Sequence, residues 1–253
     1  MRILSGAYQP DAGEIIISDQ ERVLKDPRDA YEHGIGMVYQ EQSLVPNISV
    51  AENIYLGNES QFTRFSRISW KDMNAAARKQ LAKVGLDIDP TTVTERLTYA
   101  QRQMIELAKV LTLEDRTDHR LLILLDEPTS VLEKAEIDLL FARVRALRDR
   151  ASFIFVSHRL DEVLEISDRI YVMKDGEIVT AMAPKEATIS ELHQAMVGRS
   201  LQSEYYREYD QVHPDETVVL EADSISSPGN YTNVSFTLRA GDVLGIAGVV
   251  GAG

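Results

Sequence analysis

The 253-residue sequence contains no cysteine, which excludes disulfide bonds and thiolate metal sites. It has no apolar run near the length of about 20 residues that spans a bilayer, and its start lacks the features of a signal peptide. Basic residues are few: 27 Lys and Arg face 40 Asp and Glu, a net charge of -13. That balance argues against a general nucleic-acid binder. A nucleotide ligand stays compatible, because its site uses backbone N–H groups, a few cations and a metal ion.

What the sequence does contain is a buried-strand pattern that ends in two acids. The stretch LLILLDEPTSVL, residues 121–132, runs five apolar residues into Asp126 and Glu127, and Pro128 follows. Such a run favours a strand buried on both faces. Because buried charges cost several kcal/mol unless paired or metal-bound, the acids indicate a metal-dependent site at the carboxyl edge of a parallel sheet. An ordinary strand end with solvated acids explains the dipeptide equally well.

Two further strands are predicted to deliver polar side chains to the same edge. Residues 34–39 form a β-prone segment before Gln40, whose amide can reach a metal or a water, or can simply be solvated. Residues 152–156 form a second buried strand that ends near His158. Strands that alternate with helices give a parallel sheet, so His158 is expected at the edge that holds Asp126 and Glu127. A structural or surface role for this histidine is the alternative.

Between the first strand and the acidic strand, the pattern is helical. Ser49 and Glu52 form a capping-box pattern, and residues 70–84 have helical apolar spacing that ends at Gly85. The run Leu97-Thr98-Tyr99-Ala100-Gln101 then leads into another helix. Its hydroxyl and free N–H groups predict an anion site, although a plain N-cap at Thr98 accounts for the same residues.

The remainder of the chain continues the alternation and then changes character. We expect helices over 133–150 and 160–166 and strands over 169–173 and 178–180, and before these a helical turn at residues 1–4 and a strand over 14–17. Residues 202–215 are polar and Tyr-rich, as in a linker. Strands are expected over 217–222, 231–238 and 243–247. The last runs into Gly248-Val249-Val250-Gly251-Ala252-Gly253, which matches the first six positions of the phosphate-binding motif G-x-x-x-x-G-K-[ST].

Taken in order, these segments resemble the nucleotide-binding subunits of ABC transporters. Gln40 is similar to the Q-loop glutamine, residues 97–101 stand where the LSGGQ signature belongs, and residues 122–126 resemble the Walker B strand with Glu127 beside it. Ser130-Val131-Leu132-Glu133 is similar to the D-loop, and His158 to the switch histidine. A narrower resemblance is to the ATPase subunits of ribose- and galactose-type monosaccharide importers, which carry two nucleotide-binding domains and a signature that is degenerate at its glycines, as Tyr99 and Ala100 are here.

This resemblance implies an α/β fold: a P-loop NTPase (ABC ATPase) domain with a helical subdomain at about 45–115. The first nucleotide-binding domain would cover 1–200 without its Walker A motif, a linker would cover 201–216, and the first β-strands of a second such domain would cover 217–253. By the family pattern, one phosphate loop should lie just before Met1 and the next is cut at Gly253. We therefore expect a chain truncated at both ends.

The resemblance also implies cofactors and roles, with ATP and Mg²⁺ as the ligands. Asp126 and Gln40 would serve the metal, Glu127 would be the general base, and His158 would stabilise charge on the γ-phosphate, with Gln40 also assisting catalysis. The residues implied to contact nucleotide are Leu97, Thr98, Tyr99, Ala100, Gln101, Ser130, Gly248, Gly251 and Gly253, of which 97–101 would bind ATP held by an opposing domain. Without a complete phosphate loop, the polypeptide as given is expected to bind ATP weakly and to hydrolyse it at background rate.

The implied function is an ATP-hydrolysing subunit that energises monosaccharide uptake. Its partners would be membrane permease subunits and, through the complex, a sugar-binding protein, with nucleotide-binding domains paired in cis or in trans and no nucleic acid. It would be peripheral, on the cytoplasmic face of the plasma (inner) membrane. Two alternatives stay open: a soluble ABC-type ATPase of DNA repair or translation, and a non-catalytic fragment that only associates with protein.

Overall fold

The computed structural model describes residues 1–17, 19–40, 42–117, 120–197, 217–228, 231–242 and 244–245. They form two compact units, Met1–Ile170 with Ala181–Ala187, and Tyr171–Thr180 with Thr188–Gly253. The expected linker at 201–216 lies outside the described residues. So do Gly248, Gly251 and Gly253 of the expected phosphate loop.

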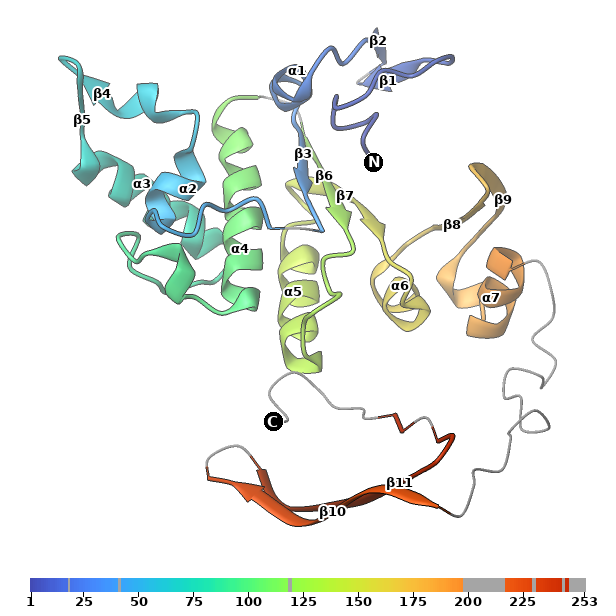
Figure 1. The fold of residues 1–253 in the computed structure, drawn as a ribbon. Coiled ribbons are helices and arrows are strands. Elements are labelled where there is room, and N and C mark those ends of the chain that lie inside the picture. The colour runs from blue at the N-terminus through green and yellow to red at the C-terminus, as the bar shows by residue number, and fades with distance from the viewer. Residues whose placement is uncertain are drawn as a thin grey trace. The chain divides into compact units, whose positions relative to one another are not determined.

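The centre of the first unit is a three-stranded parallel sheet in the order β3-β6-β7, formed by Ile35–Val38, Leu121–Asp126 and Ala151–Val156 (Figure 1). The expected buried strand is confirmed as β6, the central strand. Its first five residues are apolar and are buried, apart from the partly buried Leu122. The register pairs Val38 with Leu125 and Asp126 with Val156. All three strands therefore end at one edge of the sheet.

A helical segment connects β3 to β6. Its main helices are α2 (Val50–Tyr55), α3 (Trp70–Lys83) and α4 (Tyr99–Val110). Shorter elements complete it: η1 (Glu59–Phe62), β4 (Thr63–Arg64), β5 (Arg67–Ile68), η2 (Thr94–Arg96) and η3 (Leu111–Asp115). The predicted Ser49–Glu52 capping box is present, and α3 ends where predicted, with Gly85 in the left-handed region at φ +69°.

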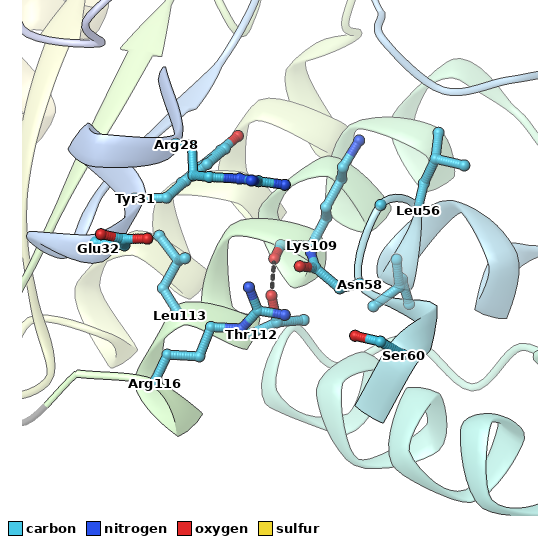
Figure 2. Close-up of a pocket in the computed structure, with 12 residues that line it drawn as sticks. Arg28, Tyr31, Glu32, Leu56, Asn58, Ser60, Lys109, Thr112, Leu113 and Arg116 are labelled. Carbon is cyan, nitrogen blue, oxygen red and sulfur yellow. Dashed lines mark hydrogen bonds between the residues drawn. The ribbon is translucent and has the colours of Figure 1, made fainter. Parts of the chain in front are cut away.

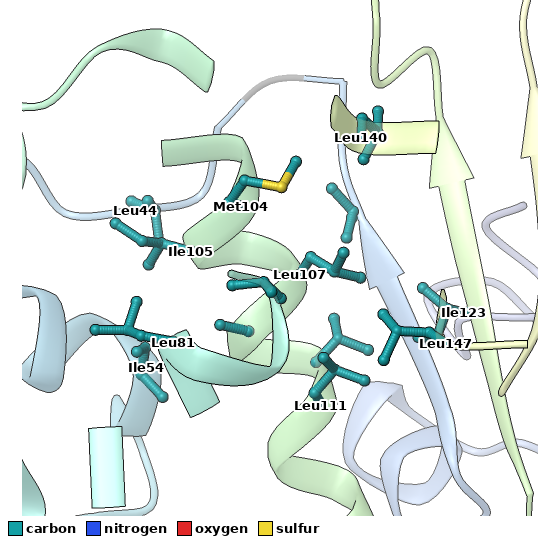
Figure 3. Close-up of a cluster of buried hydrophobic side chains, with 14 of the residues drawn as sticks. Leu44, Ile54, Leu81, Met104, Ile105, Leu107, Leu111, Ile123, Leu140 and Leu147 are labelled. Carbon is teal, nitrogen blue, oxygen red and sulfur yellow. The ribbon is translucent and has the colours of Figure 1, made fainter. Parts of the chain in front are cut away.

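The hydrophobic core joins this helical segment to the sheet. Figure 3 shows the side chains of α4 between the two, with Ile105 on the side of the helical segment beside Leu44, and Leu107 and Leu111 toward the sheet. The contact of α4 with β3 is close, because a Cβ added to Gly36 would lie 2.3 Å from Val110 Cγ1. Only glycine fits at that position without a shift of the helix.

The start of the chain packs near the sheet as small elements: β1 (Ile15–Ile17), β2 (Gln20–Arg22) and α1 (Pro27–Glu32). The first residues form hydrogen-bonded turns, with Ser5 N donating to Met1 O at 3.0 Å, and not an assigned helix. Gly6 follows at φ +74°, where a Cβ would meet Asp26 O at 2.3 Å. The predicted helical exit at Ser5-Gly6 is thus a turn that only glycine accommodates.

After β6 come α5 (Lys134–Ala146) and α6 (Leu160–Ile166), with η4 (Pro184–Glu186) beside α6. The prediction that the first of these helices extends to Arg150 is wrong. The helix ends at Ala146, and residues 147–150 turn the chain into β7, with Arg150 N and Ala151 N both donating to Leu147 O at 2.9 Å. A strand that starts at Ala151 leaves no room for another helical turn.

The remaining elements are β8 (Ile170–Lys174), β9 (Glu177–Met182), α7 (Ile189–Val197), β10 (Val218–Ser227) and β11 (Tyr231–Arg239). Each pair of strands makes its own two-stranded sheet. Much of the β10–β11 hairpin is exposed, including Val218 at 49% and Val219 at 58%. Within the described residues, none of the helices combines the length and the apolar character that crossing a bilayer requires.

Candidate functional site

The acidic pair lies where β6 leaves the sheet. Asp126 is the last residue of β6 and pairs with Val156, and the Glu127 N–H donates to the Val156 carbonyl at 2.9 Å. Glu127 is therefore still attached to the neighbouring strand although it is outside β6. Its backbone has turned out of the extended region, with φ at +44°.

A positive φ is unusual for glutamate and costs about 1–3 kcal/mol. The turn that it starts is closed by Ser130 N, which donates to the Glu127 carbonyl at 3.3 Å. Ser130, the D-loop-like residue, is thus hydrogen-bonded through its backbone to the glutamate. Strained backbone of this kind persists where the surroundings fix it, and such positions cluster at functional sites.

The side chains of Glu127 and His158 meet at this edge. His158 Nδ1 lies 3.0 Å from Glu127 Oε1, and the side chains are 64% and 26% exposed, respectively. When the carboxylate is ionised it only accepts hydrogen bonds, and Nδ1 is then the donor of this bond. A contact this exposed contributes little stability, at most about 1 kcal/mol. What the contact does is hold the histidine ring beside a glutamate whose own backbone has a fixed, unusual conformation.

A buried network lies next to this pair. Thr129 and Glu162 are almost fully buried, at 1% and 3% exposed, and the Thr129 hydroxyl donates to Glu162 Oε2. Arg159 Nη1 donates to Glu162 Oε1 at 2.9 Å. Sequence reasoning missed these residues, because Glu162 follows one acid on a short helix and reads as a solvated charge.

The oxygen-bearing side chains fit a hard divalent cation. Asp126 is partly exposed, and within the described residues its carboxylate makes no hydrogen bond or ion pair, so its oxygens are available. Carboxylate and amide oxygens are ligands that Mg²⁺ accepts, usually with several waters kept. No group of three or more His, Cys, Asp and Glu poised around a metal occurs in the described part of the chain.

Gln40 leaves β3 at the same edge but is held differently. It is exposed, and its backbone carbonyl accepts a 3.4 Å hydrogen bond from the Tyr99 hydroxyl. Burial raises the pKa of the Tyr99 phenol, so the group remains a donor at neutral pH. Two residues on, Gln42 Nε2 donates to the Tyr99 carbonyl at 3.2 Å.

The firmest attachment of this segment is a buried carboxylate on α4. Glu106 is 3% exposed and accepts from Ser43 N at 2.6 Å and from Ser43 Oγ at 2.9 Å. The chain that follows Gln40 is therefore fixed to α4. The sequence contains no sign of this contact, since its partners are 63 residues apart.

The signature-like residues form the N-terminus of α4. Thr98 is the N-cap: its Oγ1 accepts from Gln101 N at 3.2 Å, and Gln101 Oε1 accepts from Thr98 N at 2.9 Å. The plain capping role is confirmed. Leu97 is buried, and Tyr99 and Ala100 pack against the core. Among the described residues, no hydrogen bond links this helix start to Asp126, Glu127 or His158. Its hydrogen bonds reach the segment after β3 instead, at Gln40 and Gln42.

A pocket of about 530 Å³ lies elsewhere, between α1, the end of α2 and the end of α4 (Figure 2). It contains none of the residues predicted from the sequence. Three basic side chains line it, Arg28, Lys109 and Arg116, and the Thr112 hydroxyl on its floor donates to the Lys109 carbonyl at 2.7 Å. The candidate site is thus the sheet edge and not this pocket.

Solved structures share the fold of this chain. An ATP-binding cassette of an ABC transporter in its ADP conformation superposes with a TM-score of 0.64 at 21% identity, covering 78% of this chain and 82% of that chain. A dimeric cassette in a post-hydrolysis state bound to ADP and Pi gives a TM-score of 0.57 at 21% identity, covering 72% and 78%. Identities this low define the fold alone, and that fold is the α/β ATP-binding cassette expected from the sequence.

Sequence comparison assigns the family. The model of the ABC transporter family matches residues 1–130, and the chain belongs to this family. Among similar proteins, a ribose import ATP-binding protein RbsA of Bacillus cereus is 38% identical over the whole chain, which covers 50% of that protein. A ribose import ATP-binding protein RbsA 1 of Streptomyces avermitilis is 39% identical, with 100% and 47% covered. The chain spans about half the length of these curated relatives.

Proposed function

We propose that this chain belongs to an ATP-hydrolysing subunit of an ABC importer that energises uptake of a monosaccharide. The observation that carries the proposal is the edge where Asp126, Glu127 and His158 converge, with the glutamate strained and the histidine against it. The sugar assignment is supported by relatives named ribose import ATP-binding proteins, which align along the whole chain. The sheet edge supplies the chemistry of hydrolysis, and the relatives suggest the cargo.

The role proposed for Glu127 is general base. Its carboxylate is partly exposed at the edge, where it can take a proton from a water that attacks the γ-phosphate. The His158 ring has two functions available. While neutral it donates only from Nδ1, to Glu127, and its Nε2 is an acceptor; when protonated it donates from both nitrogens and can also stabilise negative charge on phosphate.

The proposed cofactors are ATP and Mg²⁺. Bound Mg²⁺ neutralises phosphate charge and orients the reacting group. Asp126 would hold it, usually through water, and the exposed Gln40 amide at the adjacent strand end would bind the metal or its water. Both side chains carry hard oxygen donors at one edge of one sheet, which is the arrangement that such an ion needs.

The start of α4 is proposed to bind the γ-phosphate of ATP on an opposing domain. Thr98 Oγ1 serves the cap as an acceptor, which leaves its own hydroxyl proton to donate to phosphate. The helix N-terminus adds free N–H groups and positive dipole charge. Because this surface is separate from the Glu127 edge, pairing of two nucleotide-binding domains, in cis or in trans, would complete a site.

The proposed partners are permease subunits in the membrane and, through them, a sugar-binding protein, with the ATPase peripheral on the cytoplasmic face. Copurification of the whole protein with its permease in lipid vesicles tests this. We expect ATP hydrolysis to rise when the permease is present and labelled ribose to accumulate only with MgATP. Full activity without any permease, or stimulation by DNA or ribosomes instead, would contradict the importer assignment.

For the 253-residue chain on its own, the expected nucleotide binding and hydrolysis differ from those of the whole protein. No complete G-x-x-x-x-G-K-[ST] occurs in the 253 residues. We therefore expect it to bind MgATP more weakly than micromolar and to hydrolyse it at background rate, because that loop contributes much of the phosphate-binding energy. Calorimetric titration of the purified chain measures this directly. Micromolar affinity would show that the chain binds nucleotide without a complete phosphate loop.

A further inference from the structure

Glu162 is a buried carboxylate that the proposed chemistry does not use. It lies in the first turn of α6, and its two oxygens accept from two different loops: Oε2 from the Thr129 hydroxyl and Oε1 from Arg159 Nη1, at 2.9 Å. Burying a carboxylate costs several kcal/mol unless its hydrogen bonds are satisfied. Both oxygens are satisfied here, which makes the group a fixed connection between the loops.

These loops carry the two facing side chains of the site. Thr129 follows Glu127 by two residues, and Arg159 follows His158 directly. Glu162 thus joins the segment that bears the glutamate to the segment that bears the histidine. Glu127 is joined to His158 by one exposed side-chain hydrogen bond, at 3.0 Å, and to Val156 by its backbone N–H. The buried carboxylate adds a further, solvent-protected link between the two segments.

The exposed pair cannot hold this geometry unaided. The His158 side chain is 64% exposed, so little packing restrains it, and one exposed hydrogen bond contributes only about 1 kcal/mol. On the other side, Glu127 has a backbone conformation that is itself unfavourable by a similar amount. The distance between His158 and Glu127 is therefore set by the two loops that bear them. In the loop after β7, Ser157 Oγ accepts a hydrogen bond from Arg159 N at 3.0 Å.

We propose that Glu162 is a positioning residue. Its buried carboxylate fixes the loop after β6 against the loop after β7, so that His158 Nδ1 meets Glu127 Oε1. The meaning of this for hydrolysis rests on the proposed function. The positioning itself is a property of the nucleotide-free chain, where it can be measured without any activity.

The experiment reads the tautomer of the neutral His158 ring by ¹⁵N NMR of the 253-residue chain without nucleotide. The His158 signals are identified by their loss in His158→Gln. In the unaltered chain we expect the Nδ1–H tautomer to dominate, because only that form donates to Glu127. In Thr129→Val, which keeps the side-chain shape and removes the donor to Glu162, we expect a shift to the Nε2–H form that free histidine prefers.

Two controls separate positioning from general loosening. Thr129→Ser keeps the hydroxyl and should keep the Nδ1–H tautomer. Thr94→Val removes another fully buried threonine hydroxyl, one that bonds Ile48 O and Asn53 in the helical segment, and should also leave the tautomer unchanged. Glu162→Gln can still accept from Arg159 and can donate to Thr129, so it should rescue the tautomer that Glu162→Ala loses.

The proposal is overturned if Thr129→Val leaves the tautomer as it was, if Thr94→Val changes it equally, or if the unaltered chain shows no preference for Nδ1–H. In the whole protein, Thr129→Val should lower kcat for ATP hydrolysis by about tenfold with KM unchanged, as for a misplaced base. If the whole protein proves not to hydrolyse ATP, the proposed function fails while the NMR result stands. If the tautomer result fails, the positioning role fails regardless of activity.

Discussion

The ends of β6 and β3 lie at the same edge of one sheet, yet they are anchored to different parts of the molecule. After β6, Glu127 is bonded through its backbone to Val156 of β7, and its loop is tied through Glu162 to the loop of His158. After β3, Gln40 is exposed, and its segment is tied to α4 through Ser43 and Glu106. The loop after β6 is thus attached to β7 and the loop that follows it, whereas the segment after β3 is attached to the helical segment.

This difference suggests a division of labour. A shift of α4 relative to the sheet would carry the Gln40 segment with it and would leave Glu127 and His158 in register, because their links stay within β6, β7 and α6. We therefore expect the distance between Glu127 and His158 to stay constant, and the position of Gln40 to follow that of the helical segment. Four changes, from the largest expected effect to the smallest, test that expectation.

Glu127→Gln should abolish hydrolysis while leaving the exit of β6 intact. The amide still accepts from His158, but it cannot take a proton, so steady-state phosphate release by the whole protein should fall at least about 100-fold. Glu95→Gln, at an exposed position outside the site, is the matched control and should retain full activity. A loss below about tenfold would mean that Glu127 is not the base.

Gly36→Ala should separate β3 from α4. The new Cβ would lie 2.3 Å from Val110 Cγ1, an overpacking that costs about 1–3 kcal/mol of unfolding free energy in a urea titration. Gly245→Ala has no neighbour within 4 Å and should be close to neutral. If the segments that follow β3 and β6 are anchored independently, the His158 tautomer stays unchanged in Gly36→Ala. A changed tautomer would show that the two exits are coupled through the sheet.

Glu106→Gln should loosen the Gln40 segment. The amide can satisfy Ser43 only in part, so we expect a loss of about 1 kcal/mol and faster amide hydrogen exchange at Ser43. Glu114→Gln is the control. This acid is also partly buried, but it pairs with Lys83, at 2.6 Å, and not with the Gln40 segment. Equal exchange at Ser43 in both variants would argue that Glu106 is not the anchor.

Tyr99→Phe should have the smallest effect. The hydroxyl bond to the Gln40 carbonyl is long, at 3.4 Å, and its removal should cost less than about 0.5 kcal/mol while the ring keeps its packing. Exchange at residues 42–43 should be unchanged. A cost above about 1 kcal/mol would identify this tyrosine, and not Glu106, as the main attachment of the segment.

Local patterns predicted the elements well. The Ser49 and Thr98 caps, the β6 strand and the delivery of His158 to the edge of Glu127 follow from short-range spacing and strand alternation, and the structure contains them. The roles assigned to these residues are still proposals. Spacing alone identifies an element and an edge, and it leaves the chemistry at that edge to be tested.

The anchors were not predictable in the same way. Glu106 and Glu162 are charged residues on helices, and charge in a sequence normally indicates a solvated face. They are buried because Ser43, Thr129 and Arg159 satisfy them, and two of these contacts join residues 63 and 33 positions apart. The positive φ of Glu127 could not be predicted from the sequence either, since glutamate rarely adopts it.

The route of the chain through the sheet also sets an order of assembly. β6 and β7 are joined by α5 alone, whereas β3 reaches β6 only across the whole segment that contains α2, α3 and α4. Closing the longer loop costs more chain entropy before its contacts form, so β6, α5 and β7 should be protected first in pulse-labelled refolding and β3 last. Glu127 and His158 would then face each other on a folding intermediate, before Gln40 has arrived.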